Sequence, residues 1–203
     1  IGCAVIPGGV GNTEQQAEAI ARLKPDGYSG TPDFLKILLD AAQAAGKDTS
    51  SLRRGLVSGA ALPPSLRQEL SSRGVEVLQC YAAAETGVIA SETPAREGVV
   101  GNEDIIVEIV DEAGQPVPHG SSGEIVVTHL ATRDFPFIRY RTGDVGVLDD
   151  QPCACGRGLP LLKSIEGRST DFVIAANGTV MHGLALIYIV RDGRDAAVSH
   201  RFQ

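Results

Sequence analysis

The segment Tyr140-Arg141-Thr142-Gly143-Asp144 holds the residue types in this chain that are best suited to bind a ligand. A strand that stops in Thr-Gly-Asp presents one carboxylate at a tight turn, because Gly143 lets the backbone bend where a side chain would clash. Asp144 can then accept two hydrogen bonds from vicinal hydroxyls, such as the 2′ and 3′ hydroxyls of a ribose. A β-turn with an Asx cap is the simpler interpretation of these residues.

Two further segments carry polar residues next to expected strands. In Cys80-Tyr81-Ala82-Ala83-Ala84-Glu85-Thr86-Gly87, the ring of Tyr81 can stack on a flat base, and Glu85 can hold a magnesium ion through oxygen. In Glu166-Gly167-Arg168-Ser169-Thr170-Asp171, the guanidinium of Arg168 suits anionic oxygens. The simpler interpretations are a packed tyrosine, a solvated loop carboxylate and a surface ion pair.

Together, the three segments resemble the core motifs of the adenylate-forming (AMP-binding) enzymes. Residues 7–16, 30–36 and 58–62 are similar to the phenylacetate–CoA ligase branch of that superfamily, and the resemblance runs from about Ile1 to about Arg191. It implies ATP-dependent activation of a small-molecule carboxylic acid, an aryl acid such as phenylacetate, through an acyl-adenylate and then transfer to coenzyme A. It thus implies ATP/AMP, Mg²⁺ and coenzyme A as cofactors, and it allows a homodimer.

The resemblance also implies roles for individual residues. Asp144 would read the ribose, Tyr81 would stack on adenine, Glu85 would hold magnesium, and Arg168 would lie near the ribose and the phosphates. Glu85 and Arg168 are therefore the expected catalytic residues. The other expected cofactor-binding residues have small side chains, which let backbone groups reach the edge of a base: Ser58, Gly59, Ala60 and Ala82.

The chain departs from the family pattern in three places. Ala84 stands where the family has Thr or Ser, so Thr86 or an upstream loop would have to supply that phosphate contact. The Ser/Thr/Gly-rich phosphate loop of relatives and their C-terminal adenylation lysine have no counterpart here. We therefore expect this chain alone to be catalytically poor. The domain hinge of relatives falls near Thr170.

Composition narrows the function classes. The 203 residues are 43% apolar and 21% charged with a net charge of −7, which fits one domain or one and a half and gives nucleic-acid binding little support. Arg141 and Arg168 could supply the local positive charge that ATP needs.

No apolar run reaches membrane-spanning length and no leader is evident, so we expect no membrane insertion and a cytoplasmic location. The ends, Ile1 and Gln203, suggest a fragment of a longer protein.

The four cysteines fall into two groups. Cys3 and Cys80 lie in expected strands and are expected to be buried thiols. Cys153 and Cys155 are one residue apart and could begin a zinc knuckle, but a structural zinc needs four ligands, so a reduced turn is the favoured interpretation. The further candidate ligands are distant histidines: His119, His129 and His182.

The fold class is α/β: part of the large N-terminal domain of an adenylate-forming enzyme, with a parallel α/β layer and a small antiparallel β-barrel, followed by the start of the C-terminal α+β domain. Residues 1–98 predict the parallel part, because strands and helices alternate. Ligands bind at the carboxyl edge of such sheets, where residues 58–62 and 81–87 lie. The predicted strands are 1–6, 26–29, 54–58 and 75–79. The first predicted helix, 13–23, is opened by a Thr13–Gln16 capping box, and the third is 63–72. The second begins at Thr31-Pro32, and one of its faces carries Phe34, Leu35, Ile37, Leu38 and Ala42.

The pattern changes after Val99. Residues 99–168 predict antiparallel β structure, and residues 169–203 predict the incomplete start of a mobile C-terminal domain. The predicted strands are 105–110, 124–128, 137–140, 145–148, 172–175 and 179–181, with an Asn177-Gly178 turn and a helix over 184–191.

Three alternatives stay open. Ala84 and the two absent parts also fit a degenerate nucleotide-binding domain. An adenylating relative in capsule or polysaccharide biosynthesis would keep the first half-reaction and change the acid or the acceptor. A zinc-stabilised interaction module would be built around Cys153 and Cys155.

Overall fold

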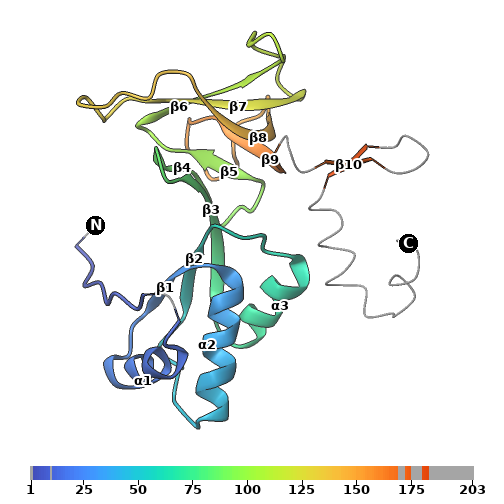
Figure 1. The fold of residues 1–203 in the computed structure, drawn as a ribbon. Helices are drawn as coiled ribbons and strands as arrows, with labels where there is room; N and C mark the ends of the chain where they lie inside the picture. The colour runs from blue at the N-terminus through green and yellow to red at the C-terminus, as the bar shows by residue number, and fades with distance from the viewer. Residues whose placement is uncertain (1, 10, 169–171, 175–179, 183–203) are drawn as a thin grey trace. The chain divides into compact units, whose positions relative to one another are not determined.

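A computed structural model describes residues 2–9, 11–168, 172–174 and 180–182. The chain divides into two compact units, Ile1–Leu78 and Gln79–Gln203 (Figure 1). Among the described residues, no helix is both long enough and apolar enough to cross a membrane.

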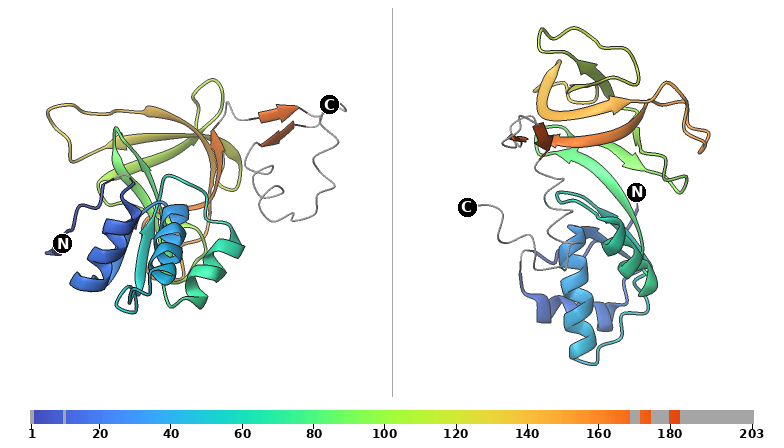
Figure 2. Two further views of the ribbon diagram at one scale, coloured as in Figure 1. Left: turned by 60° about the horizontal axis from the view of Figure 1, so that its bottom comes forward. Right: turned by 90° about the vertical axis from the view of Figure 1, so that its right-hand side faces the viewer.

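The first unit alternates helices and short strands, as the sequence predicts. β1 and β2 pair in parallel, with Gly27 opposite Arg54 and Gly30 opposite Val57. Helices α1 and α2 lie alongside one another, as two further views also show (Figure 2). The elements are α1 (Thr13–Leu23), β1 (Gly27–Gly30), α2 (Pro32–Ala44), β2 (Arg54–Val57), α3 (Pro64–Ser72) and the start of β3 (Glu76–Ala83).

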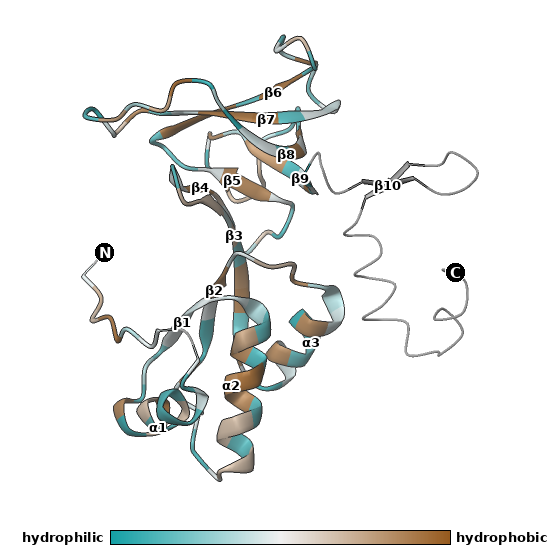
Figure 3. Ribbon diagram, in the orientation of Figure 1, coloured by the Kyte–Doolittle hydropathy of each residue, from teal (hydrophilic) through white to brown (hydrophobic). Residues whose placement is uncertain are grey.

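Helix α2 illustrates how local sequence specifies this unit. Thr31 is the N-cap, its Oγ1 accepts a hydrogen bond from the Phe34 backbone N–H at 3.4 Å, and Pro32 occupies the first turn. Hydrophobic and hydrophilic residues alternate along the helix (Figure 3). Leu35 and Leu38 are buried as predicted, whereas Ile37 is 50% exposed, because it lies off the stripe that faces the core.

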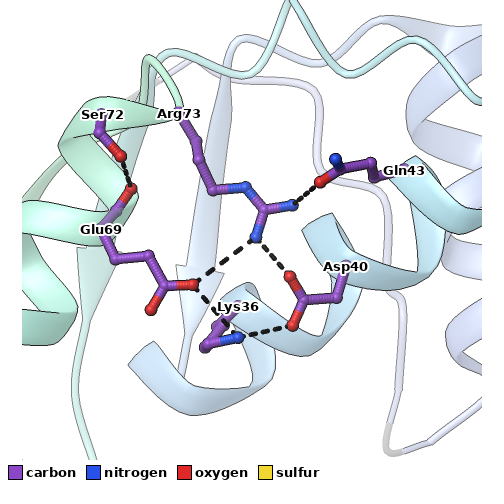
Figure 4. A network of polar contacts seen from close by, with 6 residues as sticks. All are labelled: Lys36, Asp40, Gln43, Glu69, Ser72 and Arg73. Atoms are coloured by element: carbon purple, nitrogen blue, oxygen red, sulfur yellow. Dashed lines mark hydrogen bonds and ion pairs between the residues drawn. The ribbon is translucent and has the colours of Figure 1, made fainter.

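A network of charged side chains joins α2 to the end of α3 (Figure 4). Asp40 forms two ion pairs: its Oδ2 lies 2.7 Å from Lys36 Nζ, and its Oδ1 lies 2.5 Å from Arg73 Nη1. Lys36 Nζ also lies 3.1 Å from Glu69 Oε1, and Arg73 Nη2 donates to Gln43 Oε1 at 3.2 Å. Lys36 and Arg73 therefore lower the pKa of Asp40.

Two predictions near the N-terminus are wrong. The described residues 2–9 form no strand; Val5 is 82% exposed and Cys3 is exposed too, because this apolar run has no partner strand among the described residues. The capping box does not form either: Asn12 is the N-cap, with φ 52°, and makes no side-chain cap bond. Gln16 Nε2 instead donates to the Gly11 carbonyl at 2.6 Å.

The second unit is an antiparallel sheet in the order β3-β4-β5-β9-β8-β7-β6. Antiparallel pairing begins with β3 and β4, whereas the sequence predicts the change from parallel to antiparallel structure only at Val99. It begins earlier because residues 84–86 form a tight turn that reverses the chain. Ile89, Ile125, Val127 and Leu162 are fully or almost fully buried in its core. The strands are β4 (Gly87–Glu92), β5 (Val99–Gly101), β6 (Ile105–Val110), β7 (Ser122–His129), β8 (Tyr140–Leu148) and β9 (Leu161–Arg168).

Two further strands follow. β10 (Phe172–Ile174) and β11 (Val180–His182) pair antiparallel, which confirms the predicted pair of strands. The predicted Asn177-Gly178 turn, the hinge near Thr170 and the helix over 184–191 lie outside the described residues.

Candidate functional site

The Thr142-Gly143-Asp144 segment lies inside β8 and not at a strand end. Val126 of β7 pairs with Arg141 and Glu124 pairs with Val145, so the three residues stand opposite Ile125 alone. This is a β-bulge, and it corrects the prediction of two strands separated by a turn. The second predicted piece, 145–148, is the end of β8, whereas Phe137 precedes the strand.

Each residue of the bulge has a separate structural role. Thr142 Oγ1 donates to the Ile125 carbonyl at 2.9 Å and accepts from the Asp144 backbone N–H at 3.1 Å. Gly143 has φ 76°, a conformation that L side chains rarely adopt, so the glycine is needed as predicted. The bulge thereby re-aims the side chain of Asp144 relative to a regular strand.

The hydroxyl of Tyr81 donates to Asp144 Oδ2 at 2.6 Å. Tyr81 comes from β3, where the chain makes a second register shift between Tyr81 and Ala82. Burial, and next the hydrogen bond to Asp144, raise the pKa of Tyr81 above its ordinary range, since both favour the neutral phenol. The structure therefore joins two predicted site residues that are 63 positions apart in sequence.

Arg168 lies on β9, directly opposite Asp144 of β8. Its Nε is 3.9 Å from Asp144 Oδ1, and its side chain is 71% exposed whereas that of Asp144 is 19% exposed. Arg141, the other predicted cation, forms an ion pair with Glu124, with Nε 2.7 Å from Oε2. Of the two arginines, Arg168 is thus the one beside the carboxylate.

The turn between β3 and β4 holds the predicted magnesium ligand. Glu85 is exposed at this turn and Ala84 precedes it, so the turn offers a carboxylate but no hydroxyl at residue 84. Thr86 is 5% exposed, and its Oγ1 has no hydrogen-bond partner among the described residues. The phosphate contact that Thr86 would have to supply stays a prediction.

Ser58, Gly59 and Ala60 belong to the first unit. They follow β2 at the carboxyl edge shared with β1, where Ser58 N–H donates to the Gly30 carbonyl at 3.0 Å. Gly59 has φ 74°, and both Gly59 and Ala60 are exposed. Their predicted role rests on this exposed backbone at the edge where open α/β sheets bind ligands.

The described side chains contain no group of three His, Cys, Asp or Glu residues that could hold a metal ion. The cluster of Tyr81, Asp144 and Arg168 offers a hydrogen-bonded carboxylate, an aromatic ring and an exposed guanidinium.

Sequence reasoning identified Tyr81, Asp144 and Arg168 but missed the bond between the first two. Tyr81 was expected to act through its ring, and the signal for its hydroxyl is weak, because a tyrosine at the end of an apolar strand also fits simple packing. The cross-strand partnership of Asp144 and Arg168 was missed as well, because it depends on two register shifts between β8 and β9.

The architecture matches that of known ligases. The chain superposes on a 2-hydroxyisobutyryl-CoA ligase, in the postadenylation state with R3-HIB-AMP, with a TM-score of 0.79 and 25% identity over 91% of this chain and 41% of that one. An anthranilate CoA ligase, AuaEII, gives a TM-score of 0.67 at 21% identity over 89% of this chain and 36% of that one, a likeness of fold alone. The fold is thus that of part of an adenylate-forming CoA ligase.

The sequence comparison identifies the family. The model of the AMP-binding enzymes matches residues 2–131, and the chain therefore belongs to the AMP-binding enzyme family. Phenylacetate-coenzyme A ligase from Aromatoleum evansii is 33% identical over 182 residues, or 86% of this chain. The Pseudomonas putida phenylacetate-coenzyme A ligase is 31% identical over the same share. The chain spans 41% of the length of each of these two relatives.

Proposed function

We propose that this chain supplies the nucleotide-binding part of an AMP-forming acid–CoA ligase. The observation that carries the proposal is the cluster in which Tyr81 donates to Asp144 at 2.6 Å while Arg168 lies 3.9 Å from the other carboxylate oxygen. Such a cluster suits a ribose monophosphate, because the carboxylate accepts from the hydroxyls and the guanidinium faces the anion.

Asp144 is the residue proposed to bind the ribose hydroxyls. Its Oδ2 already accepts from Tyr81, which fixes the carboxylate, and each oxygen retains capacity for a further donor. The fixed geometry lowers the entropic cost of holding a vicinal diol, because the receptor is ordered before the ligand arrives. The ring of Tyr81 packs against the core of the second unit and is partly buried, so we assign only its exposed part to the adenine.

Arg168 and Glu85 are the proposed catalytic residues. In adenylation, a carboxylate oxygen of the acid attacks the α-phosphorus of ATP, a P–O bond forms and pyrophosphate leaves. Arg168 would stabilise the charge that develops on the phosphoryl oxygens. Glu85 would hold Mg²⁺, which supplies charge neutralisation at the phosphates when bound. The assignment of Ser58, Gly59, Ala60 and Ala82 to the base stays a prediction from the sequence.

The proposed acid and acceptor are supported by the names of the relatives. Both Aromatoleum evansii and Pseudomonas putida relatives are named phenylacetate-coenzyme A ligases, which supports an aryl acid and coenzyme A as partners. A cytoplasmic location and a homodimer stay predictions.

Two measurements test the proposal. The first is AMP binding by this chain, measured by isothermal titration calorimetry. We expect weak binding that Asp144→Ala abolishes. The second is ATP–pyrophosphate exchange by the full-length gene product, with phenylacetate and a panel of aryl and fatty acids. Acid-dependent exchange that Asp144→Ala loses would support adenylation, and a folded full-length protein without exchange on any acid would refute it.

Asp149→Asn is the matched control for the Asp144 variants. Asp149 follows β8 directly, and its carboxylate lies 3.3 Å from Lys163 Nζ, with 15% of the side chain exposed. It therefore resembles Asp144 in burial and in having a cationic neighbour but lacks the tyrosine partner. We expect Asp149→Asn to leave AMP affinity unchanged, whereas Asp144→Asn should weaken it at least about tenfold, or about 1.4 kcal/mol.

A degenerate nucleotide-binding domain is the second candidate. Ala84 lacks the family hydroxyl, and the buried hydroxyl of Thr86 is poorly placed to replace it. This candidate predicts AMP binding that depends on Asp144, together with no pyrophosphate exchange by the full-length gene product. The two measurements above thus separate the candidates.

A further inference from the structure

The loop between β8 and β9 brings two thiols together. Cys153 begins a turn that the Gly156 backbone N–H closes by donating to the Cys153 carbonyl at 3.1 Å. The Cys155 backbone N–H donates to Cys153 Sγ at 3.4 Å, so the sulfur lies over the turn and faces the next thiol-bearing residue. Neither thiol takes part in the proposed nucleotide site.

The two thiols differ in environment. Cys153 is 3% exposed and packs with Val100 and Leu161, and its sulfur lies 3.6 Å from Thr93 Oγ1. Cys155 is exposed. The backbone N–H of Arg157, and then the thiol of Cys153, lower the pKa of Cys155, because both donate to its sulfur and favour the thiolate.

This asymmetry is typical of a thiol pair in which one member reacts and the other resolves. A reactive cysteine is accessible and has a lowered pKa, and its partner lies close enough to attack the first oxidation product. Two residues span at most about 7 Å even when extended, and the closed turn shortens that span into the range of disulfide Cα separations. The described residues offer no third ligand group that would favour a metal.

We propose that Cys153 and Cys155 form a reversible disulfide when a peroxide oxidises Cys155. The Cys155 thiolate attacks one peroxide oxygen; an S–O bond forms, the O–O bond breaks and hydroxide leaves, which gives a sulfenic acid. The Cys153 thiol then attacks the Cys155 sulfur; the S–S bond forms, the S–O bond breaks and water leaves with the proton of Cys153. The two thiols lose two electrons and the peroxide is reduced to two waters.

Tryptic mass mapping of the full chain tests the proposal. Cleavage after Arg141 and Arg157 places both thiols in one peptide, residues 142–157. After reduction and then brief exposure to hydrogen peroxide, this peptide should lose the mass of two hydrogen atoms and should regain it with dithiothreitol. Before oxidation, Cys155 should react with iodoacetamide several-fold faster than the exposed thiol of Cys3, because the hydrogen bonds to the Cys155 sulfur favour its thiolate.

Single variants identify the roles of the two sulfurs. Cys155→Ser, an exposed substitution that leaves the core intact, should abolish both the mass loss and the fast alkylation. Cys153→Ser should leave Cys155 reactive, but its oxidation should stop at the sulfenic acid or proceed to the sulfinic acid. Cys3→Ser is the control and should change nothing.

Four results would overturn the proposal. Cys155 could reach the sulfinic acid in the wild-type chain without forming the internal bond, it could pair with Cys3 or with a second chain, or both thiols could stay reduced at peroxide levels that oxidise glutathione. Elemental analysis that finds stoichiometric zinc, with thiols protected until a chelator is added, would assign the pair to a metal instead.

Discussion

Replacing Tyr81 with phenylalanine separates the two proposed functions of this residue. The variant keeps the ring that would stack on adenine and removes the hydroxyl that donates to Asp144 Oδ2 at 2.6 Å. If the hydroxyl orients the carboxylate, the change should lower both the stability of the protein and its affinity for AMP. If the ring alone matters, AMP affinity should not change.

The size of the effect follows from the geometry. A hydrogen bond to a charged partner contributes about 1.5–3 kcal/mol. Because 19% of the Asp144 side chain is exposed and water can partly replace the lost donor, we expect the lower part of this range, about 1.5–2 kcal/mol of unfolding free energy. The affinity loss is bounded by the same free energy, or about 30-fold, and we expect about three- to tenfold, since Arg168 still faces the carboxylate.

The assay combines chemical denaturation with calorimetric titration of AMP, for the wild type, Tyr81→Phe, Asp144→Asn and the double variant. The double variant should be little worse than Asp144→Asn alone, because the two residues act through one bond. Tyr140→Phe removes a phenolic hydroxyl from the strand that carries Asp144 and serves as the control. Unchanged stability and unchanged AMP affinity in Tyr81→Phe would refute the reasoning.

The same bond predicts a dependence on pH. Burial and the Asp144 hydrogen bond raise the pKa of Tyr81 above its ordinary value of 10.0, so the folded state favours the neutral phenol. Its contribution to stability is present below about pH 10 and is lost as the pH rises through the folded-state pKa. The difference in unfolding free energy between wild type and Tyr81→Phe should therefore narrow above about pH 10.

Four further substitutions test the packing around the site and the helix network. Thr86→Val removes a buried hydroxyl that has no partner among the described residues, and should raise the unfolding free energy by about 1 kcal/mol without changing AMP affinity; a loss of affinity would assign the hydroxyl to the ligand. Gly143→Ala should cost about 1–2 kcal/mol through backbone strain alone, and Gly146→Ala should cost more in the same denaturation assay, since its Cβ would lie 2.9 Å from the backbone carbonyl oxygen of Ser164. Asp40→Asn should lower stability by about 0.5–1 kcal/mol at low salt and by less at high salt, and an equal loss at both ionic strengths would contradict an electrostatic role.

The elements of the first unit could be predicted where the signals are local. The bounds of α1 agree with the prediction, and Thr31 with Pro32 marks the start of α2. The run at residues 1–6 misled the prediction, because an apolar pattern shows that a segment can be a strand but not that a partner strand is there. The cap of α1 depended on the conformation of Asn12, which its sequence does not specify.

The candidate site could be predicted by residue identity but not by contact. The motifs supplied Tyr81, Asp144 and Arg168, because the residue types and the family resemblance were visible in the sequence. Their mutual geometry depends on pairings between β3, β8 and β9, which lie far apart in the chain. Glycine at residue 143 indicated a positive φ correctly, but the sequence could not show whether the chain turned there or bulged within one strand.

The bulge explains why three different residue types occur in this order. Side chains alternate between the two faces of a regular strand, but three residues of β8 stand opposite Ile125 alone, so the side chains of the bulge do not follow that alternation. Thr142 holds the bulge through its two hydrogen bonds, Gly143 allows the positive φ, and Asp144 is left on the face where Tyr81 donates to it. The chemistry of this site therefore depends on the backbone path as much as on the carboxylate.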